Sequence, residues 1–482
     1  MLGGAACPLR PCSGGREDAR RPVTLYGEVS AERYSVRVLQ AVSALMVSDW
    51  RQYLSIEPAP SGQTAQSKSP PAKSIKHPGL TWNDHLVMLL HVAAEIEHGL
   101  MVQYLYAAYS LGGPDVTGDD RHALVRRWQN NLITVAKEEM GHLLTVQNIL
   151  CLLGAPINLG REDYPWDIPY YPFAFSLEKL SRSSLACYVH AEMPPHVIAM
   201  LKARPTLPKS FREFIAKDKA EIDRLVKERA AGASIHFVAT VYDEIIDILG
   251  NENLIPDSAF NEDSYGLQAS WDDWGRGYRP DPRLLDAEGN LEAEPAHQRR
   301  ANVIIMRAAT RTEALAALKA ISGQGEAVHL VAKDKDKDEA SHFERFLRVF
   351  QEFPTDWVPT RDIPANPTTR KSNKVGTTYI ASPEARAWAT LSNYRYRILL
   401  TCLAHSFRLA RESRPGEPNL RGVVMHRVFG EMYNLKTIAG IMVQLESGPP
   451  FEMPFSLRLP EDRKSTRLNS SHIQKSRMPS SA

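Results

Sequence analysis

The sequence predicts an all-α protein, a helical bundle followed by additional C-terminal helices. Several long segments repeat apolar residues at the spacing of one helix face, and the alternation typical of strands is scarce. Breaker residues follow the first two of these segments, at Gly112–Pro114 and at Gly154–Pro156. A chain of 482 residues is long enough for two or three folding units.

Composition narrows the class of protein. Hydrophobic residues make up 43% of the chain and charged residues 24%, as in soluble globular proteins. No run approaches the roughly 20 apolar residues of a membrane span, and the leader Met1–Pro22 lacks the apolar core of a signal peptide. Five cysteines, an odd number at spacings unlike those of zinc sites, indicate free thiols. We therefore expect a cytoplasmic protein that binds neither nucleic acid nor membrane, and homo-oligomers are compatible with the sequence.

The C-terminal tail, residues 462–482, resembles a translated sequencing-library adapter and is interpreted as non-native. It carries five basic residues and one acidic residue, so without it the formal net charge of +2 becomes −2. Charge therefore gives no support for nucleic-acid binding. We expect native residues beyond Glu461 to be missing.

Four parts are expected along the chain. Residues 1–79 read as a disordered leader, a short helical segment and a polar linker, and residues 80–356 as the bundle, with a large irregular insert at 158–302. A C-terminal helical region, 357–461, is expected to pack on the bundle, and the tail follows it. The predicted helices are Thr81–Leu111, Arg121–Leu153, Ser183–Glu192, Lys209–Ala230, Ile235–Leu249, Asn302–Glu326, Asp338–Phe353, Glu384–Glu412 and Arg421–Leu445.

The first predicted bundle helix carries a carboxylate in the middle of its apolar face. Glu97 shares one stripe with Leu90 and Met101, whereas Glu95 lies on another side. Burying a lone carboxylate is costly unless a cation or hydrogen-bond donors compensate for the lost water. Glu97 is therefore a candidate metal ligand, the alternative being a core Glu bonded to a Tyr or an Arg.

The second helix carries a carboxylate and an imidazole on its apolar face. Glu139 and His142 are three residues apart, so one helical face presents both side chains to the same metal ion. The same periodicity puts Glu138 with Thr134 and Thr145 on the polar side. A single motif of this kind is weak evidence, but here both members point inward.

A second Glu-x-x-His motif, Glu339 to His342, precedes a stripe of phenylalanines. The helix before it ends in Gly323-Gln-Gly-Glu326. Bundles that hold two metal ions take one Glu from each of two helices and a Glu-x-x-His from each of two others. Glu326 is the least secure member because its helix can fray near Gly325. Alternative sources of that ligand are Glu192, Glu244 and His329.

This set suits a pair of divalent ions, iron first and manganese as the alternative, because four carboxylates and two imidazoles favour these metals. Tyr104 lies two turns beyond Glu97 on the same face. We interpret it as a hydrogen-bond donor to a ligand carboxylate or a redox-active phenol, or as an ordinary core tyrosine. The predicted ligands are Glu97, Glu139, His142, Glu326, Glu339 and His342.

Four stretches resemble a known family: AAEIEHGLMVQYLYAAYSL, TVAKEEMGHLLTVQNILCLLGAP, GQGE and EASHFERF. They are similar to the ferritin-like domain of the iminophenyl-pyruvate dimer synthase type, found in violacein and rebeccamycin pathway enzymes and in stand-alone relatives. The resemblance covers Thr81 to Phe353 and implies a ferritin-like four-helix bundle. It implies the same six ligands, matched position by position. Those pathway enzymes couple two amino-acid-derived imines and carry a long additional region that this chain lacks, so the fold transfers better than the substrate.

The leading functional hypothesis is a dimetal-carboxylate oxidoreductase. It would act on a small aromatic or amino-acid-derived metabolite, with dioxygen or peroxide as co-substrate and Tyr104 as the nearby proton or electron donor. A second hypothesis is iron handling by Fe(II) oxidation, which the large insert disfavours because storage cages need compact subunits. A third is a non-catalytic helical binding module.

Overall fold

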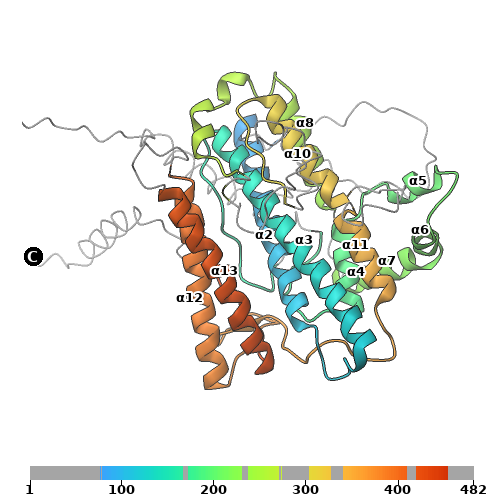
Figure 1. Cartoon of the computed structure of the whole chain (residues 1–482). Helices are drawn as coiled ribbons and strands as arrows, with labels where there is room; N and C mark the ends of the chain where they lie inside the picture. Colours follow the sequence, from blue (N-terminus) through green and yellow to red (C-terminus); the bar gives the residue numbers. More distant parts are fainter. Residues whose placement is uncertain are drawn as a thin grey trace, which may run out of the picture.

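Two long helices form the centre of the protein. α2 (Trp82–Ser110) and α3 (Gly118–Leu152) pack along each other (Figure 1). α2 begins at a capping box in which the side chains of Thr81 and Asp84 bond each other's backbone. The computed structural model describes residues 76, 79–166, 172–230, 237–270, 273, 303–326, 340–409 and 420–453.

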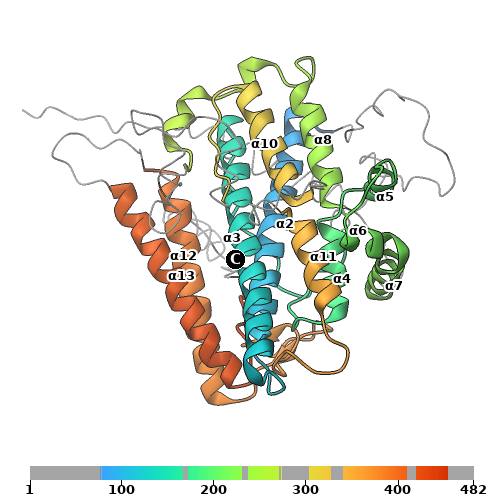
Figure 2. The ribbon, with the colours of Figure 1, turned by 45° about the vertical axis from the view of Figure 1, so that its right-hand side comes forward.

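The other half of the bundle is built from shorter helices. α8 (Val238–Gly250) packs against α2 and α10 (Arg311–Glu326), while α11 (His342–Glu352) packs against α3 and α4 (Arg182–Ala191). In Figure 2, α10 lies above α11 and α8 lies above α4, so two interrupted helices complete the bundle. On this side, α2 and α3 therefore face four short helices, where a bundle of uninterrupted helices would have two long ones.

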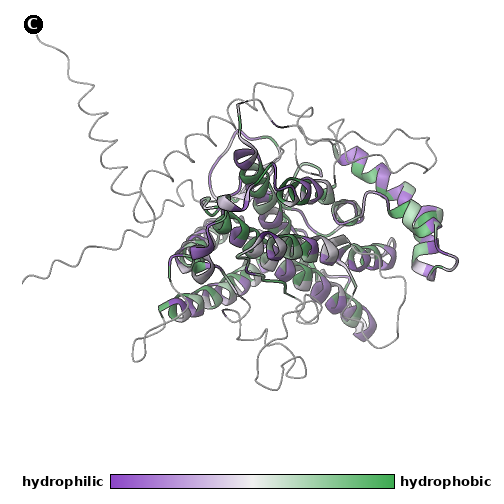
Figure 3. Cartoon of the chain, turned by 90° about the horizontal axis from the view of Figure 1, so that it is seen from above, coloured by the Kyte–Doolittle hydropathy of each residue, from purple (hydrophilic) through white to green (hydrophobic). Residues whose placement is uncertain are grey.

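The remaining elements lie around this bundle. α5 (Val197–Lys202), α6 (Lys209–Glu213), the π-helical turn Phe214–Asp218 and α7 (Lys219–Ala230) project to one side, as the view from above shows (Figure 3). Two short 3₁₀ turns, Asp257–Ala259 and Glu262–Leu267, follow α8. Strands β1 (Pro367–Thr368) and β2 (Thr378–Tyr379) pair in parallel. α12 (Pro383–Ser406) and α13 (Leu420–Gln444) form a hairpin beside the bundle, and α13 contacts α2.

The all-α prediction is confirmed, but two predicted helix starts are wrong. The helix expected from Asn302 begins at Arg311, because Thr310 and Glu313 cap it reciprocally. The segment before it is not helical and lies against α3, where Thr145 bonds the Ile304 carbonyl. The helix expected from Asp338 begins at His342, with Ser341 as its N-cap.

The predicted insert at 158–302 is not wholly outside the bundle, because α8 packs directly on α2 and α10. α4 and α8, which correspond to the predicted helices Ser183–Glu192 and Ile235–Leu249, both lie within this range. The predicted leader and linker, apart from Lys76 and Gly79, and the predicted non-native tail lie outside the described residues.

α2 satisfies the length and composition of a membrane span, although no single apolar run in the sequence suggested one. However, 83% of its most apolar stretch is buried inside the protein, as expected of a core helix. The three described cysteines, Cys151, Cys187 and Cys402, are free thiols.

Candidate metal centre

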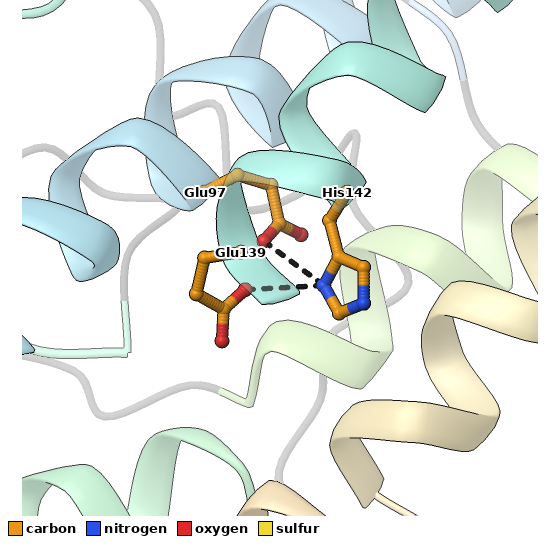
Figure 4. A group of neighbouring side chains, drawn as sticks. All are labelled: Glu97, Glu139 and His142. Carbon is orange, nitrogen blue, oxygen red and sulfur yellow. Dashed lines mark hydrogen bonds and ion pairs between the residues drawn. The ribbon is translucent and has the colours of Figure 1, made fainter. Parts of the chain in front are cut away.

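The first cluster joins α2 to α3. His142 Nδ1 lies 3.1 Å from Glu139 Oε2 and 3.5 Å from Glu97 Oε2. Figure 4 shows both carboxylates turned toward this nitrogen. All three side chains are buried, because the stripe that carries them faces the centre of the bundle. Their ligand atoms lie close enough together to share one metal ion.

A second cluster lies beside the first. His342, the first residue of α11, places Nδ1 2.8 Å from Glu139 Oε1 and 3.5 Å from Glu192 Oε2. Glu192 comes from the C-cap of α4. The two oxygens of Glu139 therefore face one cluster each, as a bridging carboxylate does between two metal ions.

Two atoms of the second cluster lack hydrogen-bond partners. Glu139 Oε1 and His342 Nδ1 are fully buried and, among the described residues, neither makes a hydrogen bond. They approach to 2.8 Å without the alignment that a hydrogen bond requires. A buried polar atom without a partner is costly, and a divalent cation would satisfy both atoms at once. The donor set thus fits a metal ion.

The pKa values of the clustered side chains also indicate that positive charge is favoured at this site. Burial and the neighbouring Glu139 raise the pKa of Glu97 to about 8. Burial opposes protonation of His142, but hydrogen bonds and charges from Glu139 and Glu97 outweigh it and raise its pKa to about 10. Burial likewise opposes protonation of His342, whose pKa is nevertheless held well above its usual range, mainly by Glu139 and Glu138. Without metal, protons on Glu97 and on the two imidazoles balance the buried charge, and metal ions would displace these protons.

A tyrosine hydroxyl bonds each of the two carboxylates that are not shared. Tyr104 Oη donates to Glu192 Oε1 at 2.5 Å, and Tyr242 Oη donates to Glu97 Oε1. Tyr104 is fully buried, and burial together with Glu192 raises its pKa well above its usual range. The structure therefore places Tyr104 against the second cluster, while Tyr242, from α8, was not singled out in the sequence.

The outer nitrogen of each imidazole also has a partner. His142 Nε2 bonds Gln324 Oε1 at 2.8 Å, and His342 Nε2 bonds Glu138 Oε2 at 2.9 Å. Glu138 is completely buried, so its placement on a polar face was wrong. α3 is covered on that side by α11, and Arg345 of α11 compensates the buried charge.

The other predicted ligands are placed less fully. Glu326 is the last residue of α10, Glu339 and His329 lie outside the described residues, and Glu244 is buried on α8 but belongs to neither cluster. Of the two alternative ligands that the structure describes, Glu192 and Glu244, Glu192 belongs to a cluster. From the GQGE motif, Gln324 bonds His142, and a Cβ on Gly325 would lie only 3.2 Å from Glu192 Oε2.

A small cavity adjoins the two clusters. Glu97, Glu139, His142, Glu192 and Tyr242 line it on the polar side, and its apolar wall includes Leu100, Val238 and Ile321. Its volume is about 10 Å³, which is room for about one water molecule. The cavity as it stands has room for a very small molecule only.

Comparison with known proteins supports the resemblance. A family model described as Ferritin-like matches residues 90–351, more than half of the chain. Dichlorochromopyrrolate synthase of Lentzea aerocolonigenes is 24% identical over 433 residues, which cover 81% of this chain and 38% of that enzyme. The 2-imino-3-(indol-3-yl)propanoate dimerase of Chromobacterium violaceum is 28% identical over 166 residues, 29% of this chain and 16% of that enzyme. The chain thus spans well under half the length of these curated relatives.

One solved structure is also similar. The crystal structure of a ferritin-like protein from Caulobacter vibrioides is 16% identical and covers 76% of this chain and 96% of its own. The two structures superpose with a TM-score of 0.42.

Proposed function

Because the chain belongs to the ferritin-like family, we propose that its two clusters together hold a pair of divalent metal ions. We propose further that the protein is a metal-dependent oxidoreductase. The ligands would be Glu97, Glu139, His142, Glu192 and His342, with Glu326 and Glu339 kept as candidates from the sequence. Iron is the expected metal and manganese the alternative, since carboxylate and imidazole donors suit both.

The observation that carries this proposal is the position of Glu139. Its two oxygens address two different imidazoles, and one of these oxygens has no hydrogen-bond partner in the described part of the chain. A purely structural polar network would satisfy such a buried oxygen by a donor. A metal pair accounts for the arrangement better than a metal-free bundle does.

The paired metals, when bound, would supply the activation of dioxygen or peroxide for oxidation of an organic substrate. The protein's own groups would hold the ligands and control protons. Tyr104 holds a proton 2.5 Å from Glu192, so it is placed to pass that proton toward the centre. Leu100, Val238 and Ile321 form the apolar wall of the cavity and would limit the water beside the metals.

The proposed substrate is a small aromatic or amino-acid-derived metabolite. Support comes from the names of the two curated relatives, one of which describes an indole-bearing imino acid. A substrate of that size exceeds the present cavity, so lining residues would have to move for it to enter.

Metal analysis of the purified protein tests the metal pair. We expect two ions per chain in the wild type and loss of metal in Glu139→Ala and His342→Ala. Glu95→Ala is a matched control, because Glu95 is a half-buried carboxylate of α2 that bonds Asn158 and belongs to neither cluster. A folded wild-type protein that binds no divalent metal would overturn the proposal.

Oxygen uptake separates the functional alternatives. We expect the metal-loaded protein to consume oxygen with an aromatic imino acid, formed in place from the 2-oxo acid and ammonia with loss of water, and not with an aliphatic one. Uptake with Fe(II) alone, unchanged by organic substrate, would favour iron oxidation instead. Two bound ions with no uptake in either assay would contradict the oxidoreductase assignment and leave the metal pair standing.

A further inference from the structure

The two clusters are built to the same plan. Each has one imidazole facing inward through Nδ1, one oxygen of the shared Glu139, and one carboxylate of its own. Each of those separate carboxylates accepts a hydrogen bond from a buried tyrosine. In these contacts between described residues, the two metal positions are alike.

The partners of the outer nitrogens break this symmetry. His142 Nε2 meets the neutral amide oxygen of Gln324, whereas His342 Nε2 meets the carboxylate of Glu138. Arg345 Nη1 contacts both oxygens of Glu138, at 3.0 and 2.9 Å. Because Arg345 is one turn after His342 on α11, both side chains hold the same carboxylate from one helix face.

An outer hydrogen bond fixes which ring nitrogen carries the proton. A proton on Nε2 leaves the Nδ1 lone pair for a metal ion, and the acceptor also prevents the ring from turning. A carboxylate acceptor makes the imidazole a stronger donor than an amide does, since it favours positive charge on the ring. Both rings are thus oriented, but His342 is oriented by the stronger partner.

We infer that Glu138 and Gln324 are positioning residues for the two imidazoles, and that their difference makes the two metal positions unequal. The position held by His342 and Glu192 binds a divalent ion more tightly and fills first. The position held by His142 and Glu97 fills second. This inference rests on the proposed metal pair.

Titration of the metal-free protein with Co(II) tests the order, because the visible absorbance of Co(II) reports each bound ion. We expect two steps in the wild type whose affinities differ at least tenfold. His342→Ala should remove the tighter step, and His142→Ala the weaker one. Glu138→Gln should weaken the tighter step by about 10- to 100-fold and bring the two steps together.

Glu138→Gln leaves Arg345 buried beside a neutral partner, and this can unfold the protein. The double variant Glu138→Gln/Arg345→Met removes both charges and gives His342 the same kind of partner as His142. We expect it to fold, as shown by far-UV circular dichroism, and to bind Co(II) in two nearly equal steps. Glu95→Gln should titrate like the wild type.

Each contrary result has a distinct meaning. A wild type that binds two ions with equal affinity would overturn the inference and leave the metal pair intact. An unchanged tenfold separation in the folded double variant would exclude Glu138 as its cause. A wild type that binds no Co(II) or other divalent ion would overturn the proposed function itself.

Discussion

His142 and His342 lie with their rings stacked, their centroids 5.4 Å apart and their planes inclined by 24°. They come from different helices, α3 and α11, yet their Nδ1 atoms face the two oxygens of a single carboxylate. This pairing brings the two candidate metal positions within the reach of one bridging side chain.

Gly325→Ala should separate stability from metal binding. The new Cβ would lie 3.2 Å from Glu192 Oε2, so that carboxylate must shift by a few tenths of an ångström. Replacing a helical glycine by alanine stabilises by up to about 1 kcal/mol. We expect the metal-free variant to be at least as stable as the wild type while binding metal more weakly.

Gly323→Ala is the matched control for that change. It lies in the same helix, and nothing lies within 4 Å of its Cβ position, so it should gain stability and keep its metal affinity. Chemical denaturation and metal titration of the two variants make the comparison. Equal metal affinity in both would show that Gly325 has no part in placing Glu192.

Tyr104→Phe should affect both stability and turnover. Without the hydroxyl, Glu192 Oε1 loses its donor, and an unpaired buried acceptor costs about 1–3 kcal/mol in the metal-free protein. If Tyr104 also supplies a proton, kcat should fall while two ions remain bound. Denaturation, metal analysis and steady-state kinetics on the same sample distinguish these effects.

Tyr188→Phe provides the comparison for Tyr104. Its ring is packed edge-on against Tyr104 with centroids 4.8 Å apart, but its hydroxyl makes no hydrogen bond within the described part of the chain. We expect its stability and its turnover to match the wild type. Wild-type turnover in Tyr104→Phe as well would remove Tyr104 from the reaction.

His85 should make the protein sensitive to acid. Burial, assisted by the charge of Lys76, lowers the pKa of His85 to about 4, while an unfolded histidine titrates near 6.5. The unfolded state therefore takes up the proton first, so stability is complete above about pH 6.5 and is lost as the pH falls toward 4. Between pH 7 and 5 the loss from His85 should be about 2 kcal/mol.

Denaturation of His85→Phe at pH 7 and pH 5 tests this expectation. The variant keeps an aromatic ring beside Trp82, which packs edge-on against His85, but has no group to titrate. It should lose less stability than the wild type over this pH range. An equal loss in both proteins would mean that His85 takes up its proton as easily when folded as when unfolded.

Phe346→Ala should destabilise the protein strongly. The ring is 1% exposed and packs against Tyr104 and Tyr188, so truncation leaves a cavity and should cost about 3–5 kcal/mol. Tyr433→Ala, at a side chain that is 69% exposed on α13, should change stability by less than about 0.5 kcal/mol. A loss below about 1 kcal/mol for Phe346→Ala would contradict this packing of the ring.

Helical periodicity was sufficient to place the three predicted ligands of the two long helices. Glu97, Glu139 and His142 all face the centre because each lies deep within an uninterrupted helix. Periodicity misplaced Glu138 because it assumes one buried face, and α3 is enclosed on more than one side. Which other helices cover α3 depends on tertiary packing and cannot be read from that segment.

Helix ends were harder to predict than helix interiors. The starts at Arg311 and His342 are both marked by capping pairs visible in the sequence, Thr310 with Glu313 and Ser341 with Glu344. Apolar periodicity alone nevertheless predicts that the two helices begin earlier, at Asn302 and Asp338. The sequence offers Glu192 only as an alternative metal ligand, because it caps a short helix. No neighbouring residue in the sequence indicates that this helix end points toward α11.

The interrupted half of the bundle has a consequence for how such a protein can diversify. Glu192, Gln324 and His342 all lie at or within a turn of a helix end, whereas Glu97, Glu139 and His142 lie in continuous helices. Insertions or deletions at the helix ends alter one side of the centre without changing the register of α2 against α3. Evolution, or an engineer, can therefore vary the chemistry by exchanging connections while the continuous pair is inherited unchanged.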